Sequence, residues 1–146
     1  MSYKGYFKPK NISKYIGDPT KIIYRSSWEL KLMSYLDSHP EVLEWSSEEF
    51  CIPYRSPVDN KIHRYYPDFK VKKLLPNNIT ETVVIEVKPL SQSIPPTLKT
   101  NKTKKKFLRE VMVWGVNEAK WKAATAYCND RKWKFMVMTE KELGIK

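Results

Sequence analysis

Two stretches decide the fold: residues 63–72 read HRYYPDFKVK, and residues 82–88 read TVVIEVK. In both, side chains suited to a buried surface recur at every second position, which is typical of β-strands. Turn-forming residues at 76–80 separate the two stretches, so we expect an antiparallel hairpin. Side chains alternate between the two faces of a strand, and the apolar face of each strand therefore points toward a common core.

The second face of this hairpin carries charge. Asp68 lies on one strand, while Glu86 and Lys88 share a face of the other, so we expect two carboxylates and an ammonium at one end of the sheet. A carboxylate in so apolar a strand loses its hydration unless it is paired or binds a cation. An ordinary ion pair with Lys88 explains the pattern equally well, and these three residues alone leave both interpretations open.

Before the hairpin we expect an arm, a helix and a strand. Residues 1–25 mix basic and aromatic side chains with little periodicity, which predicts an N-terminal arm that packs on the domain or on a partner, or merely coats the surface. An apolar stripe predicts a helix over 27–38, with Ser26 and Glu29 as a capping box at its start. Alternation over 47–54 predicts the first strand, which should form a three-stranded antiparallel meander with the hairpin.

After the hairpin we expect two helices, a strand and a short final helix. The helices are predicted over 101–114 and 118–128, with Gly115 breaking the pattern between them. Residues 133–138 predict the last strand, and Thr139 with Glu142 predicts a capping box for a short terminal helix. Because this strand follows a helical crossover, we expect it to pair in parallel. The result is an α/β (α+β) fold with a mixed central sheet flanked by helices.

Composition limits the function further. The 146 residues suffice for one domain, 1–146, and the formal net charge of +11 favours a polyanionic partner such as nucleic acid. The apolar runs are too short to cross a membrane. Cys51 and Cys128 have no metal-ligand spacing, which excludes a zinc finger and favours a reducing compartment. A glycine-rich phosphate loop is missing from the sequence, so nucleotide hydrolysis has no support.

Glu29 is a candidate third acid for the charged end of the sheet. It lies on the same helical stripe as the apolar residues that should face the sheet. Three carboxylates that converge invite a hard divalent cation such as Mg²⁺ or Mn²⁺. The capping box alone also explains a glutamate at this position, so the residues themselves leave its role open.

A basic segment precedes and opens the helix predicted over 101–114. Positive charge at a helix start opposes the helix dipole, and an external polyanion would offset that cost. We therefore prefer phosphate contact to a solvated face, and the pattern predicts little base-specific readout. The candidate DNA-binding residues are Lys99, Lys102, Lys104, Lys105, Lys106 and Arg109, together with Arg64 on the same side of its strand as Asp68.

The order Pro67-Asp68 followed by Glu86-Val87-Lys88 resembles the signature of the PD-(D/E)xK nuclease superfamily. The surrounding helix and strands are similar to the nuclease domains of transposon endonuclease subunits. Over nearly its full length the chain also resembles the head-completion nucleases of large tailed phages. The stretches that carry this wider resemblance are 4–9, 25–30, 47–49, 117–121 and 139–140.

The resemblance implies a restriction-endonuclease-like core and a Mg²⁺-dependent endonuclease, with Mn²⁺ as an alternative metal. The cation would activate a water molecule and polarise the scissile phosphate, while a lysine would orient that water or stabilise the transition-state charge. Either Glu48 or Glu49 could take the place of the helical acid. The implied metal ligands are Glu29, Asp68, Glu86 and the main-chain carbonyl of Val87, and Lys88 is the implied catalytic lysine.

The same resemblance implies a biological setting. It points to cleavage of double-stranded DNA during phage head completion and head–tail joining, in the host cytoplasm during assembly or in the virion. The expected partners are DNA and phage capsid, portal or neck proteins, without a membrane or a nucleotide cofactor. Two alternatives stay open: a non-catalytic DNA-binding virion protein on a nuclease scaffold, and a junction-resolving or restriction nuclease of the same fold.

Overall fold

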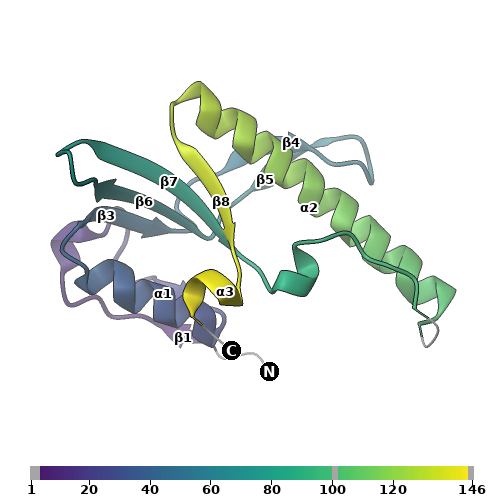
Figure 1. The fold of residues 1–146 in the computed structure, drawn as a ribbon, viewed down its shortest axis with the longest axis horizontal. Helices are drawn as coiled ribbons and strands as arrows, with labels where there is room; N and C mark the ends of the chain where they lie inside the picture. The colour runs from purple at the N-terminus through teal and green to yellow at the C-terminus, as the bar shows by residue number, and fades with distance from the viewer. Residues whose placement is uncertain (1–3, 100–101, 145–146) are drawn as a thin grey trace.

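The structure, a computed structural model, describes residues 4–99 and 102–144 (Figure 1). Its central sheet is mixed, as the sequence predicts, with strand order β3-β6-β7-β8. β6 pairs antiparallel with both β3 and β7, and β7 pairs in parallel with β8. The predicted hairpin and the parallel last strand are therefore confirmed. The four strands are β3 (Val42–Ser47), β6 (Phe69–Leu74), β7 (Thr80–Val87) and β8 (Lys134–Met138).

Helices lie on both sides of this sheet (Figure 1). α1 (Ser27–Ser38) and the short α3 (Glu140–Leu143) lie on one side, where Val83 and Ile85 of β7 join the larger apolar core. α2 (Lys104–Asp130) lies on the other side and packs on Phe135 of β8. Within the described ranges, none of the helices is both long enough and apolar enough to span a bilayer.

Smaller elements complete the fold. A two-stranded antiparallel sheet, formed by β4 (Ile52–Arg55) and β5 (Ile62–Tyr65), packs under α2. A second pair joins β1 (Gly5–Tyr6) to β2 (Ile23–Tyr24). Two single-turn 3₁₀ helices are η1 (Ile12–Lys14) and η2 (Leu90–Gln92).

The described part of the N-terminal segment belongs to the core and does not merely coat the surface. Tyr15 and Ile22 are 6% and 1% exposed and pack in the larger core. The Tyr15 ring meets Trp45 of β3 edge-on, with 4.8 Å between ring centroids, and the Tyr15 hydroxyl accepts a 3.1 Å hydrogen bond from the Ser47 N–H. The segment therefore packs on this chain's own sheet, which was one of the predicted outcomes.

The predicted boundaries of the first two strands, 47–54 and 63–72, were wrong. The predicted strand 47–54 is divided into the end of β3 and β4, because the chain turns at Glu48, whose φ is 54°. The predicted strand 63–72 is likewise interrupted between β5 and β6. The buried Pro67 lies in that gap, and proline lacks the N–H that a continued ladder requires. The two halves join different sheets, so the strands do not form a three-stranded meander.

The helical break at Gly115 was also wrong, because α2 runs unbroken from Lys104 to Asp130. One glycine costs a helix interior only about 1 kcal/mol relative to alanine, which a helix of 27 residues with a packed second half absorbs. The first half of α2 extends beyond the sheet (Figure 1). The exposed fractions of Leu108 and Met112, 53% and 56%, agree with that projection. By contrast, the helix over 27–38 and the Thr139–Glu142 capping box are confirmed.

We predict that Gly115→Ala stabilises the protein by about 0.5–1 kcal/mol, because alanine loses less conformational entropy than glycine in a helix. Space is available, since an added Cβ would meet only Pro57 Cγ, at 3.9 Å. Chemical denaturation measures the difference in the free energy of unfolding.

Gly144→Ala is the matched control. Gly144 ends α3 with φ at 71°, a left-handed conformation that costs alanine about 1–2 kcal/mol. The two glycine substitutions should therefore shift stability in opposite directions. A loss of stability in Gly115→Ala would contradict a continuous α2.

Candidate active site

Asp68 lies directly before β6, between the buried Pro67 and the first residue of the strand, Phe69. Its Oδ2 accepts a hydrogen bond of 2.8 Å from the backbone N–H of Val87, the last residue of β7. Its own carbonyl accepts from the Glu48 N–H at 3.2 Å. Asp68 is thus held between the ends of β3 and β7, as the hairpin pattern predicts.

Glu86 is buried on β7, with 7% of its surface exposed. Its Oε1 accepts a 2.6 Å hydrogen bond from the Tyr65 hydroxyl. Its Oε2 lies 3.7 Å from the ammonium of Lys88, which is an ion pair at longer range. The predicted Glu86–Lys88 pair therefore exists, and the closer partner of Glu86 is a neutral phenol.

Electrostatics makes the two acids an unfavourable pair when both are ionised. Burial, followed by the charge of Glu86, raises the pKa of Asp68 to about 8. Burial also raises the pKa of Glu86, although Tyr65, Lys88 and Lys120 oppose that rise. Two hydrogen bonds and one partly exposed lysine do not compensate both buried charges. The site therefore favours either a shared proton or an added cation.

Glu29 approaches the same region from the first turn of α1. Its N–H donates to the Ser26 hydroxyl at 3.1 Å, as the predicted cap requires, but its carboxylate accepts from the Arg25 N–H instead of closing the box on Ser26. Burial raises the pKa of Glu29, and the charges of Glu48 and Glu86 add to that rise. The charge of Glu86 thus affects Glu29, while the convergence of Glu29 with Asp68 and Glu86 on one metal ion stays a prediction.

The two alternatives to Glu29 are engaged elsewhere. Glu48 forms a bidentate ion pair with Arg25, in which both N–O distances are 3.1 Å. Glu49 accepts a 2.7 Å hydrogen bond from Tyr15. The structure therefore leaves Glu29 as the candidate whose carboxylate is held only by a backbone N–H within the described ranges.

The acids do not form a ready-made cage. Across residues 4–99 and 102–144, no three His, Cys, Asp or Glu side chains are gathered closely enough to enclose a metal ion. The donor types nevertheless fit Mg²⁺ or Mn²⁺, which prefer carboxylate and carbonyl oxygens. Magnesium also keeps several of its waters, so few protein ligands suffice. Metal binding by Glu29, Asp68, Glu86 and Val87 stays a prediction.

Sequence reasoning missed two side chains around Glu86. Strand alternation assigns Tyr65 to the apolar side of the hairpin, opposite Asp68. In the structure the strand is interrupted at Pro67, and the Tyr65 hydroxyl donates to Glu86. Lys120 of α2 lies 5.6 Å from the Tyr65 ring centroid and lowers the pKa of Glu86. Lys120 lies one helical turn before the buried Ala124, on the same face of α2. The sequence could have indicated this only if 104–130 had been predicted as one continuous helix.

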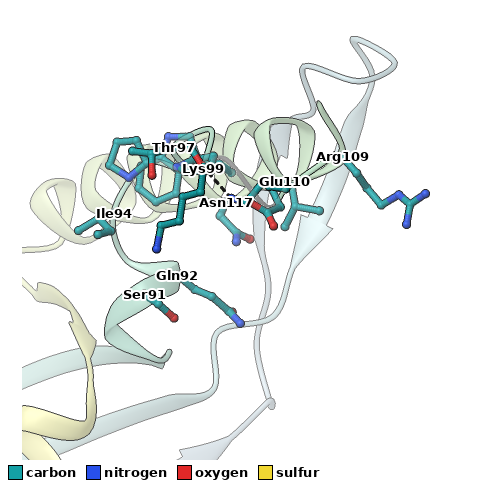
Figure 2. A pocket seen from close by; sticks show the side chains of 13 residues that line it. Ser91, Gln92, Ile94, Thr97, Lys99, Arg109, Glu110 and Asn117 are labelled. Carbon is teal, nitrogen blue, oxygen red and sulfur yellow. Dashed lines mark hydrogen bonds and ion pairs between the residues drawn. The ribbon is translucent and has the colours of Figure 1, made fainter. Parts of the chain in front are cut away.

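The basic residues divide into separate places. Lys104, Lys105 and Lys106 are exposed in the first turn of α2, and Arg64 is exposed on β5. The other three predicted DNA-binding residues, Lys99, Lys102 and Arg109, line a hollow between the segment 89–99 and α2 (Figure 2). Lys102 is already bound there, with its ammonium 2.6 Å from Glu110 and 2.8 Å from the Thr97 carbonyl.

Comparison with known proteins connects this geometry to a family. Residues 39–140 match the TnsA-like endonuclease N-terminal family, a range that contains Asp68, Glu86 and Lys88. The chain is also 41% identical, over 152 aligned positions, to the head completion nuclease of Enterobacteria phage T4. That alignment covers 100% of this chain and 99% of the phage protein. The chain therefore belongs to the TnsA-like endonuclease N-terminal family.

Proposed function

We propose that this chain is a metal-dependent DNA endonuclease of the PD-(D/E)xK type, in which residues 1–146 act as one nuclease domain. The observation that carries the proposal is the mutually repelling pair of the half-buried Asp68 and the buried Glu86, with Lys88 beside it. Charged groups held at such a cost are typical of functional sites. Membership of an endonuclease family and a net charge of +11 support DNA as the substrate.

Mg²⁺, or Mn²⁺ in its place, would be held by Glu29, Asp68, Glu86 and the carbonyl of Val87. When bound, such a cation lowers the pKa of a water molecule and neutralises charge on a phosphate oxygen. The protein's part is to present the oxygens in fixed positions. The Val87 N–H fixes Asp68, and the Tyr65 hydroxyl fixes Glu86. Asp68 Oδ1 and Glu86 Oε2 do not accept these two hydrogen bonds, so each acid keeps an oxygen for a metal ion.

Lys88 supplies the positive charge next to the acids. Its ammonium is 3.7 Å from Glu86, too far for a strong hydrogen bond, so it remains available for another anion. It can orient the attacking water or stabilise the charge that builds on the phosphate in the transition state. The exposed lysines at the start of α2 would hold the DNA backbone and add affinity without base specificity.

The relative's name suggests the biological role. It is a head completion nuclease, and by analogy we propose that this chain trims or cuts double-stranded DNA when a phage head is completed. This role would place it in the host cytoplasm during assembly, in contact with capsid, portal or neck proteins. The strained acid pair favours an enzyme over a non-catalytic DNA-binding protein, because such a protein would gain stability by losing one of the acids.

The first prediction from the proposed function concerns catalysis. Wild-type protein should nick supercoiled plasmid with Mg²⁺ or Mn²⁺, and EDTA or Asp68→Ala should stop the reaction. Glu86→Ala should lower cleavage at least about 10³-fold, because several kcal/mol of charge stabilisation are lost. Gel electrophoresis measures nicking, and fluorescence anisotropy checks that Glu86→Ala still binds DNA.

Retained cleavage by Glu86→Ala would contradict the site assignment. Bound but uncut DNA with the wild-type protein would favour the non-catalytic alternative. A strong preference for branched DNA or for one fixed sequence would instead favour a junction-resolving or restriction nuclease.

The second prediction concerns pH. The pKa of Asp68 is raised from 3.8 to about 8, so the folded metal-free protein binds a proton more tightly than the unfolded chain. Stability should therefore fall as pH rises from about 4 to about 8. Asp68→Asn should raise the melting temperature increasingly over that window. Differential scanning fluorimetry at stepped pH measures the difference.

Added Mg²⁺ or Mn²⁺ should raise the wild-type melting temperature most at the upper end of that window, where metal no longer competes with protons. Asp68→Asn should reduce this metal effect. Asp130→Asn, which removes an exposed acid at the end of α2, is the control and should retain it. Equal metal effects at pH 5 and pH 8 would contradict a metal site built on these acids.

The third prediction concerns DNA affinity. Replacing Lys104, Lys105 and Lys106 with glutamine should weaken DNA binding and reduce the slope of log K against log salt by up to roughly 2.7, since each phosphate contact contributes about 0.9. Anisotropy titrations between about 50 and 200 mM salt measure that slope. The control removes the same charge elsewhere, as Lys8→Gln, Lys10→Gln and Lys21→Gln. If the two triple variants have equal slopes, the DNA path does not follow the start of α2.

A further inference from the structure

A second feature lies next to the acid site and is not used by the chemistry proposed above. The segment 89–99 and the first half of α2 enclose a hollow of about 600 Å³, within the usual range of about 300–1,000 Å³ for small-ligand pockets (Figure 2). The chain reaches the wall of this hollow only three residues after Lys88. η2 is held there by a 2.6 Å hydrogen bond from the Leu90 N–H to Glu140.

Two unpaired amides face this hollow. Asn117 is 9% exposed, and none of the described residues forms a hydrogen bond with its side chain. Among the described residues the side-chain N and O atoms sealed from solvent without a partner are the indole nitrogens of Trp45 and Trp121, so the Asn117 amide is still reached by solvent from the hollow. A ligand in the hollow can therefore replace water on this amide. Gln92 is solvent-exposed and reaches the hollow from η2 (Figure 2), and none of the described residues forms a hydrogen bond with its side chain. Two such amides can donate to and accept from the same planar polar group.

The charges around the hollow leave one cation free on its inner side. Glu110 and Lys102 neutralise each other through their 2.6 Å contact. Lys99 points toward Ser91 and Gln92 and forms no ion pair among the described residues, while Arg109 extends outward from α2 (Figure 2). The hollow therefore offers an ammonium that a phosphate oxygen could approach.

The rest of the wall is apolar and aromatic. Ile94 contributes from the segment 89–99, and Trp114 contributes from α2. The indole of Trp114 meets Trp121 edge-on, with 5.8 Å between the ring centroids, which holds its position on the helix. Indole rings are good stacking partners for nucleobases.

We propose that this hollow binds an unpaired nucleotide of the DNA strand that passes the acid site. Its base would stack on Trp114, its polar edge would meet the amides of Asn117 and Gln92, and its phosphate would meet Lys99. The proposal rests on the proposed nuclease function and adds a substrate preference to it. DNA with an extrahelical or single-stranded nucleotide near the cut site binds better than a continuous duplex.

The test compares two short DNA duplexes of the same sequence, one fully paired and one with a single bulged 2-aminopurine. The full-length Asp68→Ala protein is used so that neither duplex is cut. The bulged duplex should bind about tenfold more tightly, because one stacked base is worth about 1–3 kcal/mol. The fluorescence of 2-aminopurine should fall on binding as the base leaves water and stacks on indole.

Asn117→Leu, which keeps the side-chain size but removes the amide, should bring the affinity for the bulged duplex close to that for the paired one. Trp114→Ala should abolish the fluorescence change. The matched control is Asn129→Leu, an exposed amide on the same helix outside this hollow, and it should keep both effects. Melting temperatures check that each variant is folded.

Equal affinity for the two duplexes in the parent protein would overturn the pocket proposal and leave the nuclease proposal intact. A preference that survives both Asn117→Leu and Trp114→Ala would also overturn it, because the bulge would then be recognised elsewhere. Failure to bind either duplex would contradict DNA as the substrate and so both proposals. If Asn117→Leu does not fold, Gln92→Leu and Trp114→Ala decide the outcome, since both side chains reach the same hollow.

Discussion

The placing of a buried and a half-buried carboxylate at the end of one hairpin is the constraint on which the rest of the structure depends. Asp68 and Glu86 repel each other where water screens them only in part, and desolvation raises the pKa of both. The Val87 N–H and the Tyr65 hydroxyl each stabilise one acid. These contacts exist only if β6 and β7 keep their register and the chain turns between β5 and β6. The unfavourable electrostatic site therefore requires a fixed arrangement of three strands, which other parts of the fold must stabilise.

The apolar cores on the two sides of the sheet supply the stability that such a site needs. The larger core joins α1, α3 and the N-terminal segment to the sheet, with Trp45, Phe69 and Met33 almost fully buried. The smaller core joins α2 to the pair β4–β5 and to Phe135. The charged site lies where elements of both cores meet. Its acid Glu29 comes from α1, and the neighbouring Lys120 comes from α2. Packing of either helix thus positions a charge as well as covering the sheet.

The parts of the fold that depend on local pattern could be predicted, and those that depend on distant packing could not. The β6–β7 hairpin, the first helix and the capping box at Thr139 follow from periodicity and turn residues within about ten positions. β3 was missed because its burial pattern does not alternate along Trp45, Ser46 and Ser47, all of which are buried. Gly115 was given too much weight, since a glycine's local preference is small beside the packing of the rest of α2.

The candidate site divides along the same line. Its charged residues stand out in sequence because a carboxylate is conspicuous in an apolar strand, and their spacing matches a known signature. Their supports, Tyr65 and Lys120, do not stand out, because a tyrosine in a strand and a lysine on a helix are ordinary until the fold brings them to Glu86. Pro67 links the two observations. It defeats the simple alternation that assigns Tyr65 to the apolar side, and it lets Tyr65 and Asp68 approach Glu86 from separate strands. A proline next to an aspartate before a strand is therefore informative in its own right, since the interruption that it imposes is what allows both residues to meet at one carboxylate.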